Sequence, residues 1–438
     1  MIPKQRRPGW QYWEVADLLR DGALDIGDGY RAKNSEMGES GLPFARAGNL
    51  NDGFHFDDAD ILSEESVQLA GEKISRPGDI TFTSKGTFGR FAIVRENTPQ
   101  FVYSPQLCYW RVKRDGIVDR TFLYYWMQGE DCMNQLNEVK GLTDMADYVS
   151  LTNQRRMWLS APPLPVQRRI AGILSAYDEL MENSQRRIQL LESMTRALYR
   201  EWFVHFRFPG HEKVKMFRPP SRPGEASAKT DGDIPQGWEV RKLGDTFKTV
   251  LGGTPSRVKP EFWEGGMIPW INSGKVNDLR ITAPSELITE LALERSAAKL
   301  MPKGTTVLAI TGATLGQVSY LEIETTANQS VVGIVDSSSL CSEWIYLTVS
   351  DRIEGIISHA SGGAQQHINK EVVNDVLVVL PPVSLAKEFK RLVGPMFREV
   401  ATLLFKIQNL RRTRDLLLPR LLSGQVEIAP SNGKETNL

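Results

Sequence analysis

The chain has 438 residues, of which 41% are hydrophobic and 24% charged, as is ordinary for a globular protein of about two to four domains. Basic and acidic residues both number 53, so no overall positive charge marks the chain as a nucleic-acid binder. Residues 1–7 are followed by no apolar run, and no segment has the roughly 18–20 apolar residues that span a bilayer. We therefore expect a cytoplasmic protein without a secretory signal or a membrane span.

Short motifs in the first 161 residues recur in the same order in residues 235–380, which indicates an internal duplication. The paired motifs are 8–10 with 235–238, 42–52 with 268–278, 77–89 with 302–316, 104–106 with 327–329, and 161–165 with 380–383. One such motif could be a common loop, but a collinear series is hard to explain by chance. The β-rich runs between the motifs, with short helices at 121–128 and 343–350, predict two mixed α/β heads.

A long amphipathic helix is predicted after each head, over residues 162–208 and 381–424. Apolar residues seven positions apart are Ile170, Tyr177, Leu191 and Leu198 in the first helix, with Ser184 as a polar break, and Phe389, Met396, Leu403, Leu410 and Leu417 in the second. Such a seam must be buried. Because roughly 35 residues span about 50 Å, each helix is longer than a small domain. We expect an antiparallel coiled coil that separates the heads; the alternative is that each helix packs on its own head.

The predicted organisation is a head followed by a helix, repeated once with pseudo-twofold symmetry, in the α/β (α+β) class. Residues 209–234 are rich in proline, glycine and charge, which is typical of an exposed linker. The predicted domains are an N-terminal head at 1–161, the helix at 162–208, the linker at 209–234, a C-terminal head at 235–380, the helix at 381–424 and a disordered tail at 425–438.

Catalytic signatures are missing from the chain. It has no GxxxxGK[ST] phosphate loop, no GxSxG elbow, no HExxH motif and no Asn/Asp-Pro-Pro-aromatic signature of amino-methyltransferases. The cysteines, Cys108, Cys132 and Cys341, form no CxxC pair and no ligand pattern with the five histidines, so we expect reduced, mostly buried thiols. The chain is expected to be no enzyme and to hold no metal or cofactor.

Polar turns in both heads carry groups that suit double-stranded DNA. Lysine and arginine attract phosphates, arginine matches guanine, and asparagine or glutamine matches adenine. The candidate DNA-binding residues of the first head are Arg46, Asn49, Ser84, Lys85, Thr87 and Arg90. Those of the second head are Asn272, Ser273, Lys275, Thr311, Thr314, Gln317, Gln365, Gln366 and His367. Lys85, Arg90 and Gln365 are the strongest candidates, and the alternative for each turn is a solvated loop without a ligand.

These motifs resemble the specificity subunits of type I restriction-modification systems over essentially the whole chain. The most specific stretches are Pro162–Gln167 and Pro77–Gly89, and Ser361–Asn369 and Leu421–Gly424 also look like the family. The resemblance implies two target-recognition domains, each of which reads one half of an interrupted, asymmetric DNA site. It also implies that the helices set the gap and dock two methyltransferase (modification) subunits, which carry S-adenosylmethionine, and that motor-nuclease (restriction) subunits complete the complex.

The two halves differ in their polar loops, so base contacts cannot be transferred from one head to the other. Residues 145–150 of the first half stand where the second half has residues 364–369, and residues 381–385 lack the glutamine that follows the first Pro-Pro pair. Two other functions stay open. One is a stand-alone DNA methyltransferase or nuclease, which the missing motifs disfavour, and the other is a coiled-coil adaptor whose heads bind protein.

Overall fold

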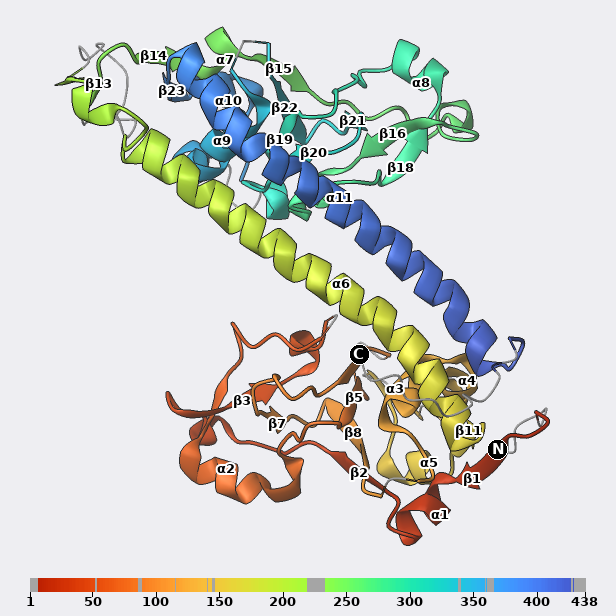
Figure 1. Ribbon diagram of the computed structural model, residues 1–438. Coiled ribbons are helices and arrows are strands. Elements are labelled where there is room, and N and C mark those ends of the chain that lie inside the picture. Colours follow the sequence, from red (N-terminus) through yellow and green to blue (C-terminus); the bar gives the residue numbers. More distant parts are fainter. Residues whose placement is uncertain are drawn as a thin grey trace. The chain divides into compact units, whose positions relative to one another are not determined.

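The structure is a computed structural model (Figure 1) that describes residues 7–51, 53–85, 89–114, 116–139, 141–143, 146–218, 233–337, 340–358, 360, 366–426 and 428. The chain forms two compact units, each of which contains one head and parts of both long helices. Unit 1 comprises Met1–Met181 and Asn409–Leu438, and unit 2 comprises Glu182–Gln408. Among the described residues, no helix has the length and apolar character needed to cross a membrane.

The head of unit 1 is built on an antiparallel sheet in the order β2-β8-β5-β6. Its strands are Leu24–Asp28 (β2), Leu107–Val112 (β8), Ile80–Thr83 (β5) and Phe91–Ile93 (β6). A smaller sheet, β4-β3-β7, contains Ile61–Ser63 (β4), Gly41–Ala45 (β3) and Val102–Tyr103 (β7). Separately, Gln11–Glu14 (β1) pairs with Trp158–Ala161 (β11). Every residue of β5 is buried, as expected for a central strand that is covered on both faces.

The helices of this head are short, and α3 shows how the sequence sets their bounds. They are Val15–Arg20 (α1), Glu64–Ala70 (α2), Arg120–Gln128 (α3), Glu130–Val139 (α4) and Leu151–Arg155 (α5). The carboxylate of Asp119 accepts hydrogen bonds from the backbone N–H groups of Thr121 and Phe122, which caps α3. The apolar residues that follow are buried in the core with β5 and β8, which confirms the helix predicted at 121–128.

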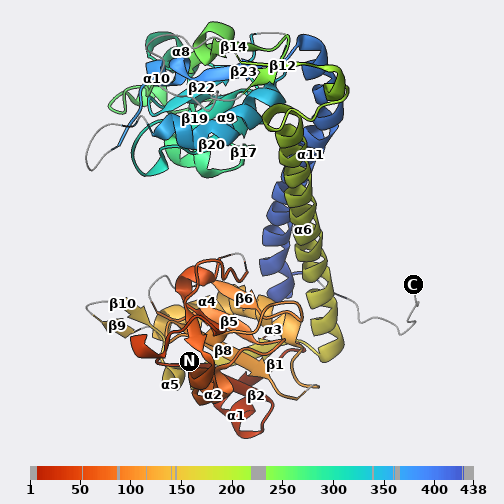
Figure 2. The same cartoon turned by 90° about the vertical axis from the view of Figure 1, so that its left-hand side faces the viewer.

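The head of unit 2 contains a sheet in the order β15-β22-β19-β20-β17 and a smaller one, β18-β16-β21. The strands of the larger sheet are Lys248–Leu251 (β15), Val331–Val335 (β22), Thr306–Ala309 (β19), Val318–Leu321 (β20) and Arg280–Ile281 (β17). Those of the smaller sheet are Glu286–Ile288 (β18), Ile268–Ile271 (β16) and Thr326–Ala327 (β21). The remaining elements are Glu239–Lys242 (β14), which pairs with Leu377–Leu380 (β23), and the helices Leu243–Thr246 (α7), Glu290–Arg295 (α8), Ser342–Ile357 (α9) and Lys370–Asp375 (α10). Helix α9 packs on the larger sheet (Figure 2), which confirms the helix predicted at 343–350.

The two heads share one topology, which confirms the internal repeat. The sheet β2-β8-β5-β6 corresponds to β15-β22-β19-β20, β4-β3-β7 to β18-β16-β21, and β1-β11 to β14-β23. The register is shared too, because Trp110 lies opposite Ile80 as Ile334 lies opposite Thr306. Within the described residues, the first head adds α4 and the hairpin Gly141–Thr143 (β9) with Ala146–Tyr148 (β10), and the second adds β17.

Two long helices, Leu164–Tyr199 (α6) and Val383–Leu422 (α11), contribute to both units. They run antiparallel in each unit. In unit 1, Asp178 pairs with Arg414, and Leu174 of α6 shares the head's core with Leu421 of α11. The predicted pairing of the helices is therefore confirmed within each unit, and the alternative also holds in part because their ends join the cores of the heads.

In unit 2 the same antiparallel packing recurs with different residues. Ile188 packs with Val400 and Leu403, and Arg187 pairs with Glu399. Past α6, the ring of Phe203 lies 4.8 Å from that of Phe389 near the start of α11. Of the predicted linker, residues 219–232 lie outside the described residues, whereas Met216–Phe217 (β12) pairs with Ile234–Pro235 (β13). Of the predicted tail, only residues 425, 426 and 428 are described.

Candidate nucleic-acid interface

Three polar segments of the first head meet at one end of its main sheet, where β5 finishes. They are residues 46–50 after β3, residues 84–85 and 89–90 between β5 and β6, and residues 148–150 before α5. Arg90 joins the first two segments, because its Nη1 donates to the backbone carbonyls of Ala47 and Leu50, each at 3.3 Å. The third segment joins through a β-bridge between Lys85 and Tyr148.

Gln106 is a second link between these segments. Its side-chain Oε1 accepts a hydrogen bond from the backbone N–H of Ala47 at 3.0 Å. Its backbone carbonyl accepts from the backbone N–H of Ser84 at 2.9 Å and from the Ser84 hydroxyl at 3.3 Å. Gln106 was not among the residues predicted from the sequence, although a glutamine ends the same repeated motif at 106 and at 329, which is a signal for it.

The structure gives the candidates of the first head different surroundings. Lys85 and Arg46 are exposed, and Arg46 pairs with Asp60 at 2.6 Å. Asn49 holds its own turn, because its Oδ1 accepts from the backbone N–H of Arg46 and its Nδ2 donates to the carbonyl of His55. Ser84 is fully buried, so its hydroxyl stabilises the turn from inside. Thr87 lies outside the described residues.

The second head brings together three equivalent segments, residues 272–275, 311–317 and 366–369. Thr311 forms a β-bridge with His367, and the backbone N–H of Gly312 donates to the carbonyl of Gln366 at 3.0 Å. The side chains of Gln317, Gln366 and His367 are exposed. Gln365 lies outside the described residues.

The other candidates of the second head take part in turn contacts. The Oδ1 of Asn272 accepts from the backbone N–H of Lys275, and the ammonium of Lys275 pairs with Asp278 at 2.7 Å. The Thr314 hydroxyl donates to the carbonyl of Thr311. Ser273 is half-buried. These side chains shape the turns that present the exposed residues.

Matching hydrogen bonds show which residues of the two heads are equivalent. The backbone N–H of Val149 donates to the carbonyl of Ser84, as that of Ile368 donates to the carbonyl of Ile310. Lys85 therefore corresponds to Thr311, and Tyr148 to His367. In the same way, the carbonyl of Arg90 accepts from Thr83 N–H as that of Gln317 accepts from Ala309 N–H, so Arg90 corresponds to Gln317. One backbone frame thus presents basic side chains in the first head and neutral ones in the second.

Arg257 is a further cation of the second head that was not predicted from the sequence, and it lies beside Trp270 of β16, the strand that precedes residues 272–275. It follows β15, and its guanidinium lies 3.6 Å from the ring of Trp263. Two hydrogen bonds, of 2.6 and 2.7 Å, join it to Glu286 and lower the pKa of that carboxyl. The only sequence signal was a cation flanked by prolines, Pro255 and Pro260, which does not by itself indicate a site.

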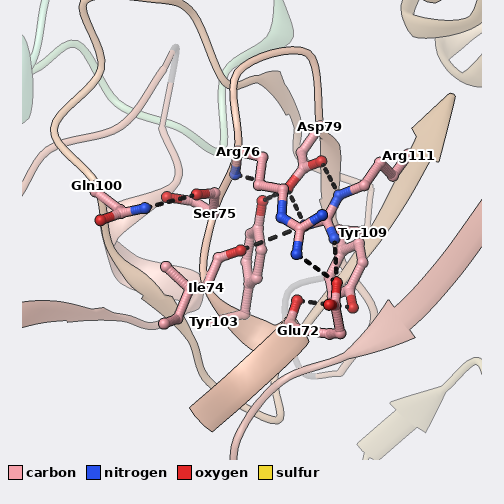
Figure 3. Close-up of polar contacts among 9 residues, drawn as sticks. All are labelled: Glu72, Ile74, Ser75, Arg76, Asp79, Gln100, Tyr103, Tyr109 and Arg111. Atoms are coloured by element: carbon pink, nitrogen blue, oxygen red, sulfur yellow. Dashed lines mark hydrogen bonds and ion pairs between the residues drawn. The ribbon is translucent and has the colours of Figure 1, made fainter. Parts of the chain in front are cut away.

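A buried polar network fixes the other end of β5 in the first head (Figure 3). Both oxygens of Asp79 accept hydrogen bonds from the Arg111 guanidinium, at 2.6 and 2.8 Å, and Oδ2 also accepts from the hydroxyl of Tyr103. Burial, followed by the nearby Asp79 charge, raises the pKa of Tyr103. Burial also raises the pKa of Tyr109, whose hydroxyl donates to the carbonyl of Glu72, to about 12. The Pro-Gly-Asp motif therefore has a structural role.

The chain belongs to the family whose model is described as the type I restriction modification DNA specificity domain, which matches residues 9–193 and 235–388. The type I restriction enzyme MjaIX specificity subunit of Methanocaldococcus jannaschii is 25% identical over 372 residues, which cover 84% of this chain and 82% of the relative. The type I restriction enzyme HindI specificity subunit of Haemophilus influenzae is 23% identical over 421 residues, which cover 84% of this chain and 90% of the relative.

The fold is similar to that of the type I restriction-modification S subunit from M. genitalium. That crystal structure matches with a TM-score of 0.59 at 13% identity, over 98% of this chain and 99% of the other. Family, relatives and fold agree with the resemblance found in the sequence. The predicted function, DNA specificity within a type I restriction-modification system, is confirmed, and the methyltransferase, nuclease and adaptor alternatives gain no support.

Proposed function

We propose that each head reads one half of an interrupted, asymmetric DNA site through its three joined polar segments, which we call its reading segments. The observation that carries this proposal is the shared backbone frame with different side chains. A common frame places both sets of side chains in the same geometry on their heads, and different side chains then make different contacts with bases and phosphates. Lys85 of the first head corresponds to Thr311 of the second, and Tyr148 corresponds to His367.

The two heads grip DNA with different chemistry. Exposed cations such as Arg46 and Lys85 attract the phosphates next to the half-site of the first head. The second head presents neutral donors and acceptors, Gln317, Gln366 and His367, so it depends more on hydrogen bonds to base edges. Thr87 and Gln365, which lie outside the described residues, remain proposed contacts. The zero net charge of the chain fits a complex in which partner subunits supply part of the backbone grip.

The long helices set the gap between the half-sites and dock two methyltransferase subunits. Apolar side chains on α6 support this role, because Leu190 and Met194 lie four residues apart and are 62% and 46% exposed. The methyltransferase subunits bring S-adenosylmethionine, motor-nuclease subunits complete the complex, and this chain performs no chemistry of its own. The proposed domain bounds are the heads 1–161 and 235–380, the helices 162–208 and 381–424, the linker 209–234 and the tail 425–438.

A head exchange tests the reading proposal. The chain is expressed with its methyltransferase partner, and methylation-sensitive sequencing of the host genome reveals the modified bipartite motif. Replacing residues 235–380 with the head of another specificity subunit should change one half of that motif and leave the other half and the gap as they were. A change in both halves, or a modified site without a gap, would contradict independent reading by the heads.

A second experiment tests whether the chain is catalytic. The purified chain is incubated with DNA and labelled S-adenosylmethionine, with and without the methyltransferase subunits. We expect label in DNA only when those subunits are present. Methyl transfer or strand cleavage by the chain alone would contradict the non-catalytic assignment.

A further inference from the structure

A basic cavity of about 250 Å³ lies in the first head, at the opposite end of β5 and β8 from the reading segments. The described residues that line it are Arg76, Pro77, Gly78, Arg111, Val112, Lys113 and Arg120. Its lining residue Gly78 precedes the first pair of the β5–β8 ladder, Ile80 with Trp110. Lys85 of the reading segments follows the last pair, Thr83 with Leu107. The cavity therefore lies at the end of the sheet that is remote from the DNA half-site proposed for this head.

Two of the cations in this cavity are already neutralised. The Arg111 guanidinium is held by Asp79, and the Arg76 guanidinium pairs with Glu72 at 2.6 Å (Figure 3). The Arg76 hydrogen bond is the main reason why the pKa of Glu72 is lowered, and the same carboxylate also pairs with Arg111 at 3.1 Å.

The other two cations, Lys113 and Arg120, are exposed. Neither forms a side-chain hydrogen bond or ion pair with any other residue that the structure describes. The lining thus has two positive charges more than its carboxylate partners supply. An excess of cations around a cavity is the arrangement that an anionic ligand would complete.

One of these cations, Arg120, lies close to the backbone of Gly78 at the cavity wall. Gly78 has φ +90°, a conformation that favours glycine, and a Cβ at this position would lie 2.9 Å from Nη1 of Arg120. Arg120 is the first residue of α3, whose start is fixed by the Asp119 cap. Arg111, whose side chain is 7% exposed, forms a rigid floor. The Arg111 guanidinium is therefore fixed before any ligand arrives, which lowers the entropy cost of binding, and the Arg120 guanidinium lies next to it over Gly78.

The second head lacks this set of charges. Ser342 follows the N-cap of α9 as Arg120 follows the N-cap of α3, and it lies beside Gly304, the counterpart of Gly78. A Cβ on Gly304 would lie 3.4 Å from the hydroxyl of Tyr320 and 3.5 Å from that of Ser342. Because the shared scaffold forms with neutral groups here, the cations of the first head are not a requirement of the fold.

We propose that this cavity binds a phosphate group through Lys113 and Arg120. Guanidinium groups match phosphate oxygens in geometry, and an ammonium group adds a mobile point charge. The phosphate can belong to a small molecule or to a DNA segment other than the half-site read by this head. In both cases the site is separate from the reading segments, so its ligand could be bound while the half-site is occupied.

Calorimetric titration of the full-length chain with inorganic pyrophosphate at constant ionic strength tests the site. We expect saturable binding that weakens roughly tenfold in each of Lys113→Gln and Arg120→Gln, as for the loss of one charge-assisted hydrogen bond. Arg114→Gln is the matched control. It removes one positive charge from an exposed residue next to Lys113 that does not line the cavity. Thermal unfolding of each variant confirms that it is folded.

Two results would overturn the proposal: no saturable binding by the wild-type chain, or an equal loss of affinity in Arg114→Gln. A competition arm then identifies the source of the phosphate. If duplex DNA without the cognate site displaces pyrophosphate from the wild-type chain, the ligand is a DNA backbone phosphate. If it does not, the ligand is a small phosphate compound. Both of these outcomes require the phosphate site.

Discussion

Arg280 donates two hydrogen bonds to Oε1 of Glu192, from Nε at 3.0 Å and from Nη2 at 2.7 Å, and both side chains are only 1% exposed. Glu192 belongs to α6 and Arg280 to β17, so a buried charge pair fastens the helix to the head within unit 2. The guanidinium also packs on aromatic rings, of which Phe397 is nearest at 3.9 Å. Glu322 completes the cluster at 3.3 Å from Nη1.

Replacing Arg280 with methionine should destabilise the protein by about 3–5 kcal/mol, because two buried carboxylates lose the partner that offsets their desolvation. Urea unfolding of the full-length chain measures this loss. The control is Arg257→Met, which breaks the exposed pair with Glu286 and should cost no more than about 1 kcal/mol. Equal losses in the two variants would show that the buried cluster has no special role in stability.

Glu322 should make stability depend on pH in the opposite sense from an ordinary surface carboxylate. Burial raises its pKa above the reference value of 4.5 despite the nearby Arg280 charge. The folded state therefore binds this proton more readily than the unfolded state, and the charged carboxylate is a penalty that is relieved as pH falls through the folded pKa. We expect Glu322→Gln to be at least as stable as the wild type at pH 7, and this advantage to shrink towards pH 4.5. An advantage that grows on acidification would refute this assignment.

The cysteines should be inert in the folded protein. Cys108, Cys132 and Cys341 are all buried free thiols, and burial raises the pKa of Cys341 to about 12. Because the thiolate is the reactive form, an aromatic disulfide reagent should label none of them at pH 8 and all of them in denaturant. Raising the pH to 9 should not change the result for the folded chain. Rapid labelling of any cysteine under native conditions would contradict the burial.

Much of the fold could be predicted from the sequence because its signals are local. The heptad spacing from Ile170 to Leu198 identified α6, and the repeated motifs aligned the two heads before any contact was known. The buried pair of Glu192 and Arg280 could not be predicted, since 88 positions separate its members. A glutamate on a long helix ordinarily faces water, and only the tertiary structure shows that this one is covered.

The candidate site was predictable in position but not in the role of each side chain. The turns at 46–50 and 84–90 were predicted from their polar residues, and in the structure Arg90 binds the first turn through the carbonyls of Ala47 and Leu50. Residue type alone could not distinguish a group that faces ligand from one that holds a turn. Asn49 caps its own turn, and whether it also contacts a base stays a prediction. Gln106 was missed because its role depends on two segments that are remote in sequence.

Gln106→Ala should weaken recognition of one half-site only. Losing the side-chain amide removes the acceptor for Ala47 N–H and loosens the turn that carries Arg46. In the complex with methyltransferase subunits, we expect each base change in the half-site of the first head to cost about 1 kcal/mol or less of binding free energy. The other half-site should keep its specificity. Gln329→Ala, which removes the acceptor of the Thr254 hydroxyl in the second head, is the control and should leave the half-site of the first head unaffected. Relaxation of both halves by either variant would contradict this division.

Lys85 should contribute to DNA affinity through charge rather than through base selection. Its exposed ammonium lies in the reading segments of the first head, where Thr311 occupies the equivalent position of the second. Each phosphate that a cation neutralises releases counterions, so Lys85→Gln should lower the slope of log K against log salt by about 1 and weaken cognate and non-cognate DNA alike. The control is Lys248→Gln. Lys248 is exposed at the start of β15, and its partner across the sheet, Val335, is the last residue of β22, at the end of the sheet away from the reading segments. An unchanged slope in Lys85→Gln, or an equal change in Lys248→Gln, would show that the lysine does not meet a phosphate. A loss confined to cognate DNA would instead mean that Lys85 reads a base, because a phosphate contact cannot distinguish sequences.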